Sequence, residues 1–277
     1  MYDAPVLIIG GNGKTGRRVD LLLKEQGIAT RPVSRSTPIP FDWSRPDGWG
    51  AVMEGARKAY VTFQPDLAVA GSTEAIAEFS RQALGKGIEH IVLLSGRGEP
   101  GAQRAEAALR TSGIGWTTVR ASWFNQNFSE GYLIDGVLAG EVALPAQPVA
   151  EPFVDADDIA AVVFAALTDS RHLNRLYEVT GPRSLNFAEA VAEISAATAR
   201  HIDYRRISPD EFAERLHPVA EREIIGLLNE LFTVVLDGRN TCIADGVERA
   251  LGRPAKDFAD YARETAASGV WDKLEQD

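Results

Sequence analysis

The sequence predicts an α/β protein with a doubly wound parallel sheet of the Rossmann type, followed by a smaller, mostly helical C-terminal substrate lobe. The chain opens on an apolar run that passes at a series of glycines into a helical pattern. Short apolar runs then alternate with helical patterns until residue 180, and helical patterns predominate afterwards. We therefore predict a dinucleotide-binding domain over residues 1–180 and a substrate or lid lobe over residues 181–277, with residues 121–152 contributing to the substrate pocket.

Residues 6–19 form the first predicted strand, turn and helix. Gly10, Gly13 and Gly16 are spaced G-x-x-G-x-x-G. This spacing suits a tight turn, a close approach of backbone to ligand and a helix packed closely on its strand. The N–H groups and the positive dipole end at the helix start favour a pyrophosphate. We predict cofactor contacts from the three glycines and from their neighbours Asn12, Lys14 and Thr15.

The glycine turn has two other interpretations. Gly13-Lys14-Thr15 matches the end of a nucleotide-triphosphate loop, but that motif requires glycine where this chain has Ile8. The triphosphate loop is therefore excluded. A glycine-rich turn that binds no ligand remains the alternative.

The end of the second predicted strand, residues 28–33, indicates which dinucleotide is bound. NAD enzymes place Asp or Glu there to hold the ribose 2′-hydroxyl, whereas this chain has Ser34-Arg35-Ser36. A guanidinium pairs with a 2′-phosphate, and the missing carboxylate removes a repulsion against it. We therefore predict NADP(H), with Ser34 and Arg35 in the site; a solvated loop charge is the alternative for Arg35.

The next two predicted strands add residues to this edge. Residues 38–43 are predicted as a short strand that ends at Asp42, whose carboxylate either accepts from the adenine amino group or caps the following turn. Residues 59–64 are predicted as the fourth strand. We expect Phe63, Gln64 and Pro65 to border the nicotinamide ribose, because ligands bind at the carboxyl edge of such sheets.

Further strands are predicted over residues 88–94, 115–120 and 176–180. Short-chain dehydrogenases use a Ser at the end of the strand before a helix that carries Tyr-x-x-x-Lys. Ser95 occupies the first position, but residues 99–112 contain neither Tyr nor Lys. A phenol with a lowered pKa is therefore excluded from this helix as the general acid. Ser95 is retained as a cofactor contact and as a weak candidate for catalysis.

An aromatic and amide-rich segment follows the strand at residues 115–120. It supplies the predicted substrate residues Trp123, Phe124, Asn127 and Phe128, and Phe153 joins them later in the chain. Aromatic rings stack on planar cations, and hydride transfer to an iminium carbon requires no added proton. Plain core packing is the alternative for each ring.

Composition excludes other classes of function. A net charge of −10 argues against a direct grip on nucleic acid. The chain has one cysteine, no apolar run of membrane-spanning length and no basic signal region. We expect a cytoplasmic protein with a small-molecule substrate, no membrane partner and no metal site; the sequence leaves a homodimer open.

Several segments together resemble the NmrA-like, atypical short-chain dehydrogenase family. They are Gly10-Gly-Asn-Gly-Lys-Thr-Gly-Arg-Arg, Ser34-Arg35, Phe41-Asp42-Trp43, Ser95-Gly96, Trp123-Phe-Asn-Gln-Asn-Phe, Phe153-Val-Asp-Ala-Asp-Asp-Ile-Ala and Tyr177-Glu-Val-Thr-Gly-Pro. Phe41-Asp-Trp43 and Trp123-Phe124 most resemble the ergot-alkaloid branch, of the agroclavine and festuclavine dehydrogenase type. The resemblance implies an NADPH-dependent iminium reductase, or a relative of the quinone and triphenylmethane-dye reductases.

Two hypotheses follow from the sequence. The first is an NADPH-dependent oxidoreductase that transfers hydride to a small aromatic, iminium or quinone-like acceptor without a Tyr-Lys proton relay. The second is a non-catalytic regulatory protein that senses NADP(H) and acts through a protein partner, which the family resemblance also allows.

Overall fold

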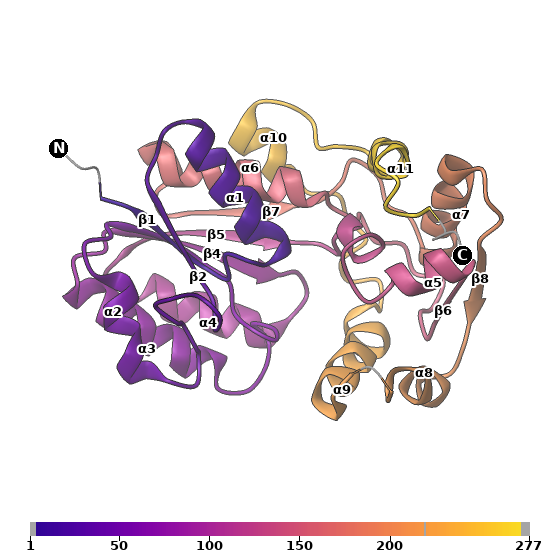
Figure 1. Cartoon of the computed structure of the whole chain (residues 1–277), viewed down its shortest axis with the longest axis horizontal. Helices are drawn as coiled ribbons and strands as arrows, with labels where there is room; N and C mark the ends of the chain where they lie inside the picture. The colour runs from indigo at the N-terminus through magenta and orange to yellow at the C-terminus, as the bar shows by residue number, and fades with distance from the viewer. Residues whose placement is uncertain (1–3, 219, 273–277) are drawn as a thin grey trace. The chain divides into compact units, whose positions relative to one another are not determined.

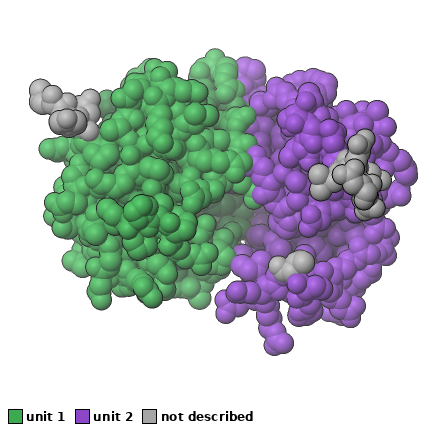
Figure 2. Space-filling model, in the orientation of Figure 1, with its two compact units in different colours: residues 1–121, 156–179, 245–253 green, residues 122–155, 180–244, 254–277 purple. Residues whose placement is uncertain are grey.

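The structure is a computed structural model that describes residues 4–218 and 220–272. The chain forms two compact units, coloured separately in Figure 2. Unit 1 comprises Met1–Ala121, Ala156–Val179 and Asp245–Arg253, and unit 2 comprises Ser122–Asp155, Thr180–Ala244 and Pro254–Asp277. The chain thus passes between the units several times. One passage lies between Val179 and Thr180, next to the predicted boundary, but residues 122–155 lie in unit 2 and residues 245–253 lie in unit 1.

Unit 1 is built on a six-stranded parallel sheet in the order β2-β1-β3-β4-β5-β7, which confirms the predicted fold class (Figure 1). The strands are β1 Val6–Ile9, β2 Thr30–Val33, β3 Lys58–Val61, β4 His90–Gly96, β5 Gly115–Ala121 and β7 Arg175–Val179. Pro32 lies in β2, which is tolerated because β2 is an edge strand paired only with β1. The parallel order brings the carboxyl ends of β2, β1 and β3 next to one another.

Helices cover both faces of this sheet (Figure 1). One face carries α1 (Lys14–Glu25), α6 (Ala156–Thr168) and α10 (Gly246–Leu251), and the other carries α2 (Trp49–Met53), α3 (Ser72–Gly85) and α4 (Pro100–Arg110). The helices bury apolar side chains against the sheet, among them Ile76, Phe79, Leu109 and Val162. Gly27 ends α1 with a φ of +70°, as expected of a residue just past a helix.

The strand predicted over residues 38–43 is wrong. Pro38 and Pro40 have no N–H to donate to a sheet, and the segment instead forms turns. The Thr37 hydroxyl donates to the Ser34 carbonyl at 2.8 Å, and the Phe41 N–H donates to the same carbonyl at 2.9 Å. Phe41 is buried against the rings of Trp49 and Phe79. Its side chain therefore belongs to the core without a strand to carry it.

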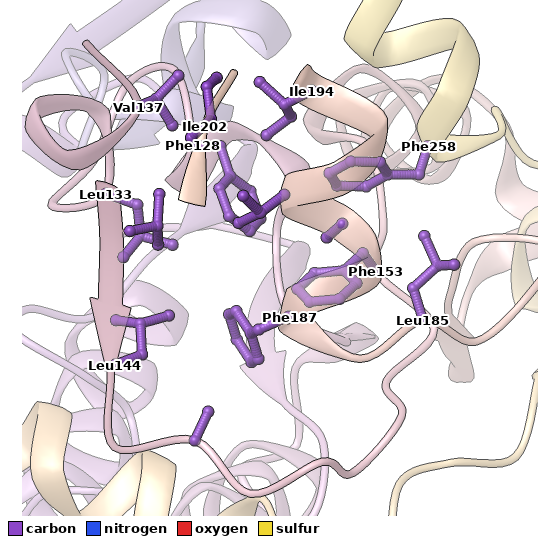
Figure 3. Packing of buried hydrophobic residues seen from close by; sticks show 14 of the residues in the cluster. Phe128, Leu133, Val137, Leu144, Phe153, Leu185, Phe187, Ile194, Ile202 and Phe258 are labelled. Atoms are coloured by element: carbon purple, nitrogen blue, oxygen red, sulfur yellow. The ribbon is translucent and has the colours of Figure 1, made fainter. Parts of the chain in front are cut away.

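Unit 2 is largely helical. Its elements are α5 Ile134–Ala139, β6 Glu141–Leu144, α7 Phe187–Thr198, β8 Asp203–Arg206, α8 Pro209–Leu216, α9 Arg222–Glu230, a π-helix at Leu231–Val235 and α11 Phe258–Ala267. The parallel pair β6–β8 was not predicted. β8 has the sequence Asp-Tyr-Arg-Arg and is mostly exposed, so it lacks an apolar pattern. Phenylalanine side chains fill the core, including Phe128, Phe153, Phe187 and Phe258 (Figure 3).

Two helices of unit 2 begin at capping residues. Asn186 and Glu189 form a reciprocal capping box at α7. Ser208 accepts from the Glu211 N–H at 3.1 Å at α8. The Glu211 carboxylate accepts from Arg205 at 2.8 Å and does not return to the cap, so the capping box at α8 is half formed.

The helices of the described residues are too short or too polar to cross a lipid bilayer.

A buried polar chain lies at the amino edge of the sheet in unit 1. His90 Nε2 lies 2.9 Å from the Thr117 hydroxyl, which itself donates to the His172 carbonyl at 2.7 Å. Because that hydroxyl proton is already used, His90 donates through Nε2. Burial lowers the pKa of His90 to about 4, with Lys58 and His172 adding to the effect.

The free energy of unfolding should therefore fall in mild acid. Below pH 6.5 the unfolded chain protonates His90 while the folded chain does not until about pH 4, so this stabilisation is present above pH 6.5 and declines as the pH falls. We expect the free energy of unfolding of His90→Gln to fall less between pH 7 and pH 4.5, by about 2 kcal/mol. Urea titrations measure this, with exposed His217→Gln as the control. Parallel pH curves for His90→Gln and the parent protein would contradict the assignment.

Candidate functional site

The glycine turn of unit 1 has the geometry that each glycine was expected to provide. Gly10 has a φ of +78°, which favours glycine, and its N–H donates to the Val33 carbonyl at 3.1 Å. A Cβ at Gly16 would lie 2.2 Å from the Gly10 carbonyl oxygen, so this helix position packs directly on the turn. A Cβ at Gly13 would meet only that same oxygen, at 3.1 Å. Gly13 is therefore the position with space for a ligand.

The start of α1 is suited to an anion. Gly13 is the N-cap and has no side chain to bond the first N–H groups of the helix. The first turn also contains no acidic residue that would offset the positive end of the dipole. A phosphate group would satisfy both deficits at once. These residues therefore fit the pyrophosphate of a dinucleotide.

The end of β2 lies beside this turn. The Asn12 amide donates to the Ser34 hydroxyl at 3.1 Å, which joins the glycine turn to the residue after β2. Arg35 is exposed, and its guanidinium has no hydrogen bond or ion pair with another described residue. Asp42 accepts from the Ser44 N–H and hydroxyl at 2.8 and 2.7 Å, and these bonds, with smaller contributions from Arg45 and Arg35, lower the pKa of Asp42. Asp42 thus forms the turn that was its alternative role.

The end of β3 completes this edge. The Thr62 hydroxyl donates to the Ile9 carbonyl at 3.0 Å, and the Thr62 carbonyl accepts from the Trp43 indole at 3.2 Å. The partly exposed rings of Trp43 and Phe63 lie 4.7 Å apart between centroids. Gln64 and Pro65 follow as exposed residues joined by a cis peptide bond. The structure therefore gathers most of the predicted cofactor residues at the ends of β2, β1 and β3.

Two predicted cofactor side chains face the interior. Thr15 is buried, and its hydroxyl accepts from the Tyr60 hydroxyl at 2.8 Å. Only its backbone N–H remains at the helix start. Ser95 is also buried, and its hydroxyl donates to Glu106 at 2.6 Å. This bond corrects the expectation for Ser95, because its proton is used inside unit 1 and is not aimed at a ligand.

Ser95 belongs to a buried ionic network. Glu106 on α4 is fully buried and receives two bonds from Arg120, at 2.9 Å and 2.6 Å. Arg120 also donates to Glu178 on β7 at 2.6 Å. Glu106 on α4 thus accepts from both the Ser95 hydroxyl and the Arg120 guanidinium, and the arginine compensates its buried charge. Where a Tyr-Lys relay is missing, unit 1 has this buried network of Ser95, Glu106 and Arg120.

In unit 2 the predicted substrate residues separate into two groups. Phe128 and Phe153 are buried in the core, with centroids 6.0 Å apart and 5.7 and 5.6 Å from Phe258 (Figure 3). Their assignment to a substrate surface is therefore corrected to core packing. Trp123, Phe124 and Asn127 are partly exposed. The Trp123 ring packs on Phe232 with centroids 4.9 Å apart, so this ring has one packed side and some open surface.

Sequence reasoning missed Tyr132. Its ring is partly exposed, yet its hydroxyl is buried and has no hydrogen-bond partner among the described residues. Burying a hydroxyl without a partner costs about 1–3 kcal/mol. The sequence carried no signal for this, because the environment of Tyr132 depends on Phe232, which is remote in the chain.

Among the described residues no group of three or more His, Cys, Asp or Glu side chains is placed to hold a metal ion.

The fold and the open glycine turn define a Rossmann-type α/β protein. The NmrA-like family model matches residues 103–258, and the chain belongs to that family. Three relatives match nearly the whole chain. Prestalk A differentiation protein A of Dictyostelium discoideum is 26% identical over 94% of this chain and 92% of its own length. The NAD(P)H azoreductase of Xenophilus azovorans is 28% identical (95% and 98%), and agroclavine dehydrogenase of Claviceps fusiformis is 26% identical (96% and 98%).

Solved structures share the fold. A nucleoside-diphosphate-sugar epimerase from Staphylococcus aureus has a TM-score of 0.80 at 17% identity, covering 94% of this chain and 99% of its own. An NADPH-dependent quinone oxidoreductase of Escherichia coli bound to NADPH has a TM-score of 0.77 at 17% identity (94% and 99%). NmrA, a negative transcriptional regulator bound to NADP, has a TM-score of 0.69 at 17% identity (98% and 99%). The similar identities of the sequence relatives leave the branch within the family unresolved.

The two glycines allow a matched test of the turn. Gly16→Ala places a methyl group against the Gly10 carbonyl and should lower the free energy of unfolding by about 3 kcal/mol, as overpacking does. Gly13→Ala meets the same oxygen at 3.1 Å and should cost less than about 1 kcal/mol. Urea unfolding followed by circular dichroism measures both. Equal losses would show that Gly16 does not fix the helix on the turn.

Proposed function

We propose that this protein is an NADPH-dependent reductase that transfers hydride to a small aromatic, iminium or quinone-like acceptor. The observation that carries the proposal is the uncapped, acid-free start of α1 at Gly13, beside an exposed guanidinium at Arg35. Bound NADPH would supply the hydride. The chain's own residues supply the phosphate cradle, the selection of cofactor and the surface for the acceptor.

Arg35 and Ser34 select the phosphorylated cofactor. Arg35 follows β2 by two residues, where an NAD enzyme carries a carboxylate, and its guanidinium is exposed. A guanidinium binds phosphate through paired hydrogen bonds, and the nearby Ser34 hydroxyl offers another polar contact. Asn12 holds that hydroxyl toward the glycine turn. The 2′-phosphate therefore binds next to the pyrophosphate cradle.

The acceptor binds on aromatic surface. Trp123 and Phe124 offer rings for stacking, and Asn127 offers an amide that both donates and accepts. A planar cation on such rings gains about 1–2 kcal/mol when it is desolvated. Hydride transfer to a cationic carbon gives a neutral product and requires no acid, which agrees with the use of Ser95 in a buried bond to Glu106.

The relatives support a reductase and leave the acceptor open. An azoreductase and an agroclavine dehydrogenase are similarly related to this chain, and a quinone oxidoreductase shares its fold. These proteins are named for different acceptors. We therefore propose a class of acceptor, conjugated and planar, and do not assign an alkaloid of the ergot branch.

A second candidate is a sensor that binds NADP(H) and acts through a protein partner. It is favoured by the burial of Ser95 and Glu106, which removes the usual acid from unit 1, and by the fold shared with a regulator bound to NADP. A sensor would bind the cofactor tightly and oxidise none of it.

Arg35→Ala should weaken NADPH binding at least tenfold and change NADH binding by less than about twofold, because the lost charge contacts only the 2′-phosphate. Isothermal titration with each cofactor measures this. Arg57→Ala is the control, since Arg57 is an exposed arginine that precedes β3 at the opposite edge of the sheet. Equal losses for both cofactors in Arg35→Ala would remove the assignment of NADP(H).

Turnover separates the two candidate functions. We expect the protein to oxidise NADPH steadily with at least one member of a panel containing a cyclic iminium, a para-quinone, an azo dye and a cationic triphenylmethane dye. Absorbance at the nicotinamide band measures the rate. Gly13→Val should lose this activity together with NADPH binding, because its side chain fills the phosphate position. Saturable NADPH binding without oxidation by any acceptor would favour the sensor.

A further inference from the structure

Tyr132 is a buried phenol whose hydroxyl is left without a partner. The hydroxyl makes no hydrogen bond with the described residues. Tyr261, a buried tyrosine of unit 2, differs because its hydroxyl donates to the Ser129 hydroxyl at 2.8 Å. Phenylalanine at position 132 would avoid the cost of the unmatched hydroxyl. An unsatisfied buried group of this kind in a native protein calls for an explanation, and a binding or catalytic role is one of those that apply.

The surroundings of Tyr132 are aromatic. Its ring lies edge-on to Phe232, with centroids 6.4 Å apart, and the ring of Trp123 packs on Phe232 at 4.9 Å. Phe232 therefore contacts both Trp123, the ring proposed to stack on the acceptor, and Tyr132, whose hydroxyl has no partner among the described residues. Phe187 and Phe212 also contact Phe232 and offer no polar atom.

The element that carries Phe232 is unusual. Leu231–Val235 is a π-helix that continues directly from α9. Short π-helical turns are rare and occur frequently at functional sites. Asn229 lies one turn earlier, and its Oδ1 atom is also buried without a partner among the described residues. The Tyr132 hydroxyl and this irregular helical turn thus share Phe232 as a neighbour.

We propose that the Tyr132 hydroxyl binds the polar atom of the acceptor and stabilises the negative charge that forms there when hydride is transferred. This inference rests on the proposed reductase function and deepens it. It specifies a conjugated acceptor with an oxygen or nitrogen that becomes anionic, such as a quinone. Trp123 stacks on the acceptor ring.

The chemistry balances without an acid in the site. The quinone gains two electrons and one proton as hydride, and NADPH becomes NADP⁺. The resulting hydroquinone anion carries its charge on oxygen, where the phenol donates a hydrogen bond, and it takes its second proton from water after release. A fixed donor at such a position acts on the transition state more than on the neutral substrate.

Tyr132 is suited to this role because it stays neutral. Burial raises the pKa of Tyr132 far above its ordinary value. No cation that would lower this pKa contributes to the shift, in contrast to a phenol beside a lysine. The group therefore donates a hydrogen bond at all pH values near neutrality and does not titrate. The rate should show no dependence on a tyrosine ionisation.

Tyr132→Phe tests the proposal with Tyr261→Phe as the matched control. In Tyr132→Phe we expect kcat/KM for a para-quinone to fall at least tenfold, because removal of one such donor commonly costs about 10²–10³ in rate. The value for a cationic triphenylmethane dye, whose product is neutral, should change less than threefold. Tyr261→Phe should leave both values unchanged and lower the Tm, because it loses the bond to Ser129. Tyr132→Phe should keep or raise the Tm.

Failure of this inference is distinguishable from failure of the reductase. If the parent protein turns over the quinone and Tyr132→Phe does so equally well, the role of Tyr132 is overturned and the reductase stands. If the parent protein binds NADPH but reduces no acceptor, the reductase fails. Binding of 4-nitrophenolate to the NADP⁺-loaded protein then tests Tyr132 alone: at least tenfold tighter binding to the parent than to Tyr132→Phe supports it, and equal or absent binding overturns it.

Discussion

The site depends on the close packing of the first turn of α1 against the Gly10 carbonyl. A Cβ at Gly16 would come within 2.2 Å of that oxygen, so the helix start lies directly over the end of β1. This placement aims the first N–H groups of α1 at the carboxyl edge of the sheet. The Asn12 amide then ties the turn to Ser34 at the end of β2. One steric constraint thereby brings the phosphate cradle and Arg35 to the same edge.

The interior of unit 1 explains why this cradle lacks a proton relay. Glu106 is fully buried, so its charge requires partners, and it has them in Arg120 and the Ser95 hydroxyl. Removing one partner from such a network commonly costs about 3–5 kcal/mol. The residues that could have served as an acid thus stabilise α4 against β5. The proposed hydride transfer would therefore either avoid proton transfer or use groups from outside the network.

The sequence predicted the parts of the fold that have strong local signals. The apolar strands and the glycine turn can each be recognised within a short segment. The exposed strand β8 did not, because its pairing with β6 depends on residues distant in sequence. The prediction of a strand at residues 38–43 was wrong because Phe41 packs in the core from a segment of turns, and an apolar residue alone does not show that a strand carries it. Among site residues, Gly13 follows from its spacing with Gly10 and Gly16, and its contact with phosphate stays a prediction. The inward direction of the Ser95 hydroxyl could not be predicted, because it depends on the position of Glu106.

The aromatic residues show why pocket and core are hard to separate in a sequence. Phe128 and Trp123 lie in one short segment and are equally apolar, yet Phe128 is fully buried and Trp123 keeps open surface. Burial of either ring lowers the free energy, so the hydrophobic effect alone does not distinguish a ring packed in the core from a ring in a ligand site. A polar atom does distinguish them. The Tyr132 hydroxyl disfavours its own burial, and a bound acceptor that accepts its hydrogen bond relieves that cost.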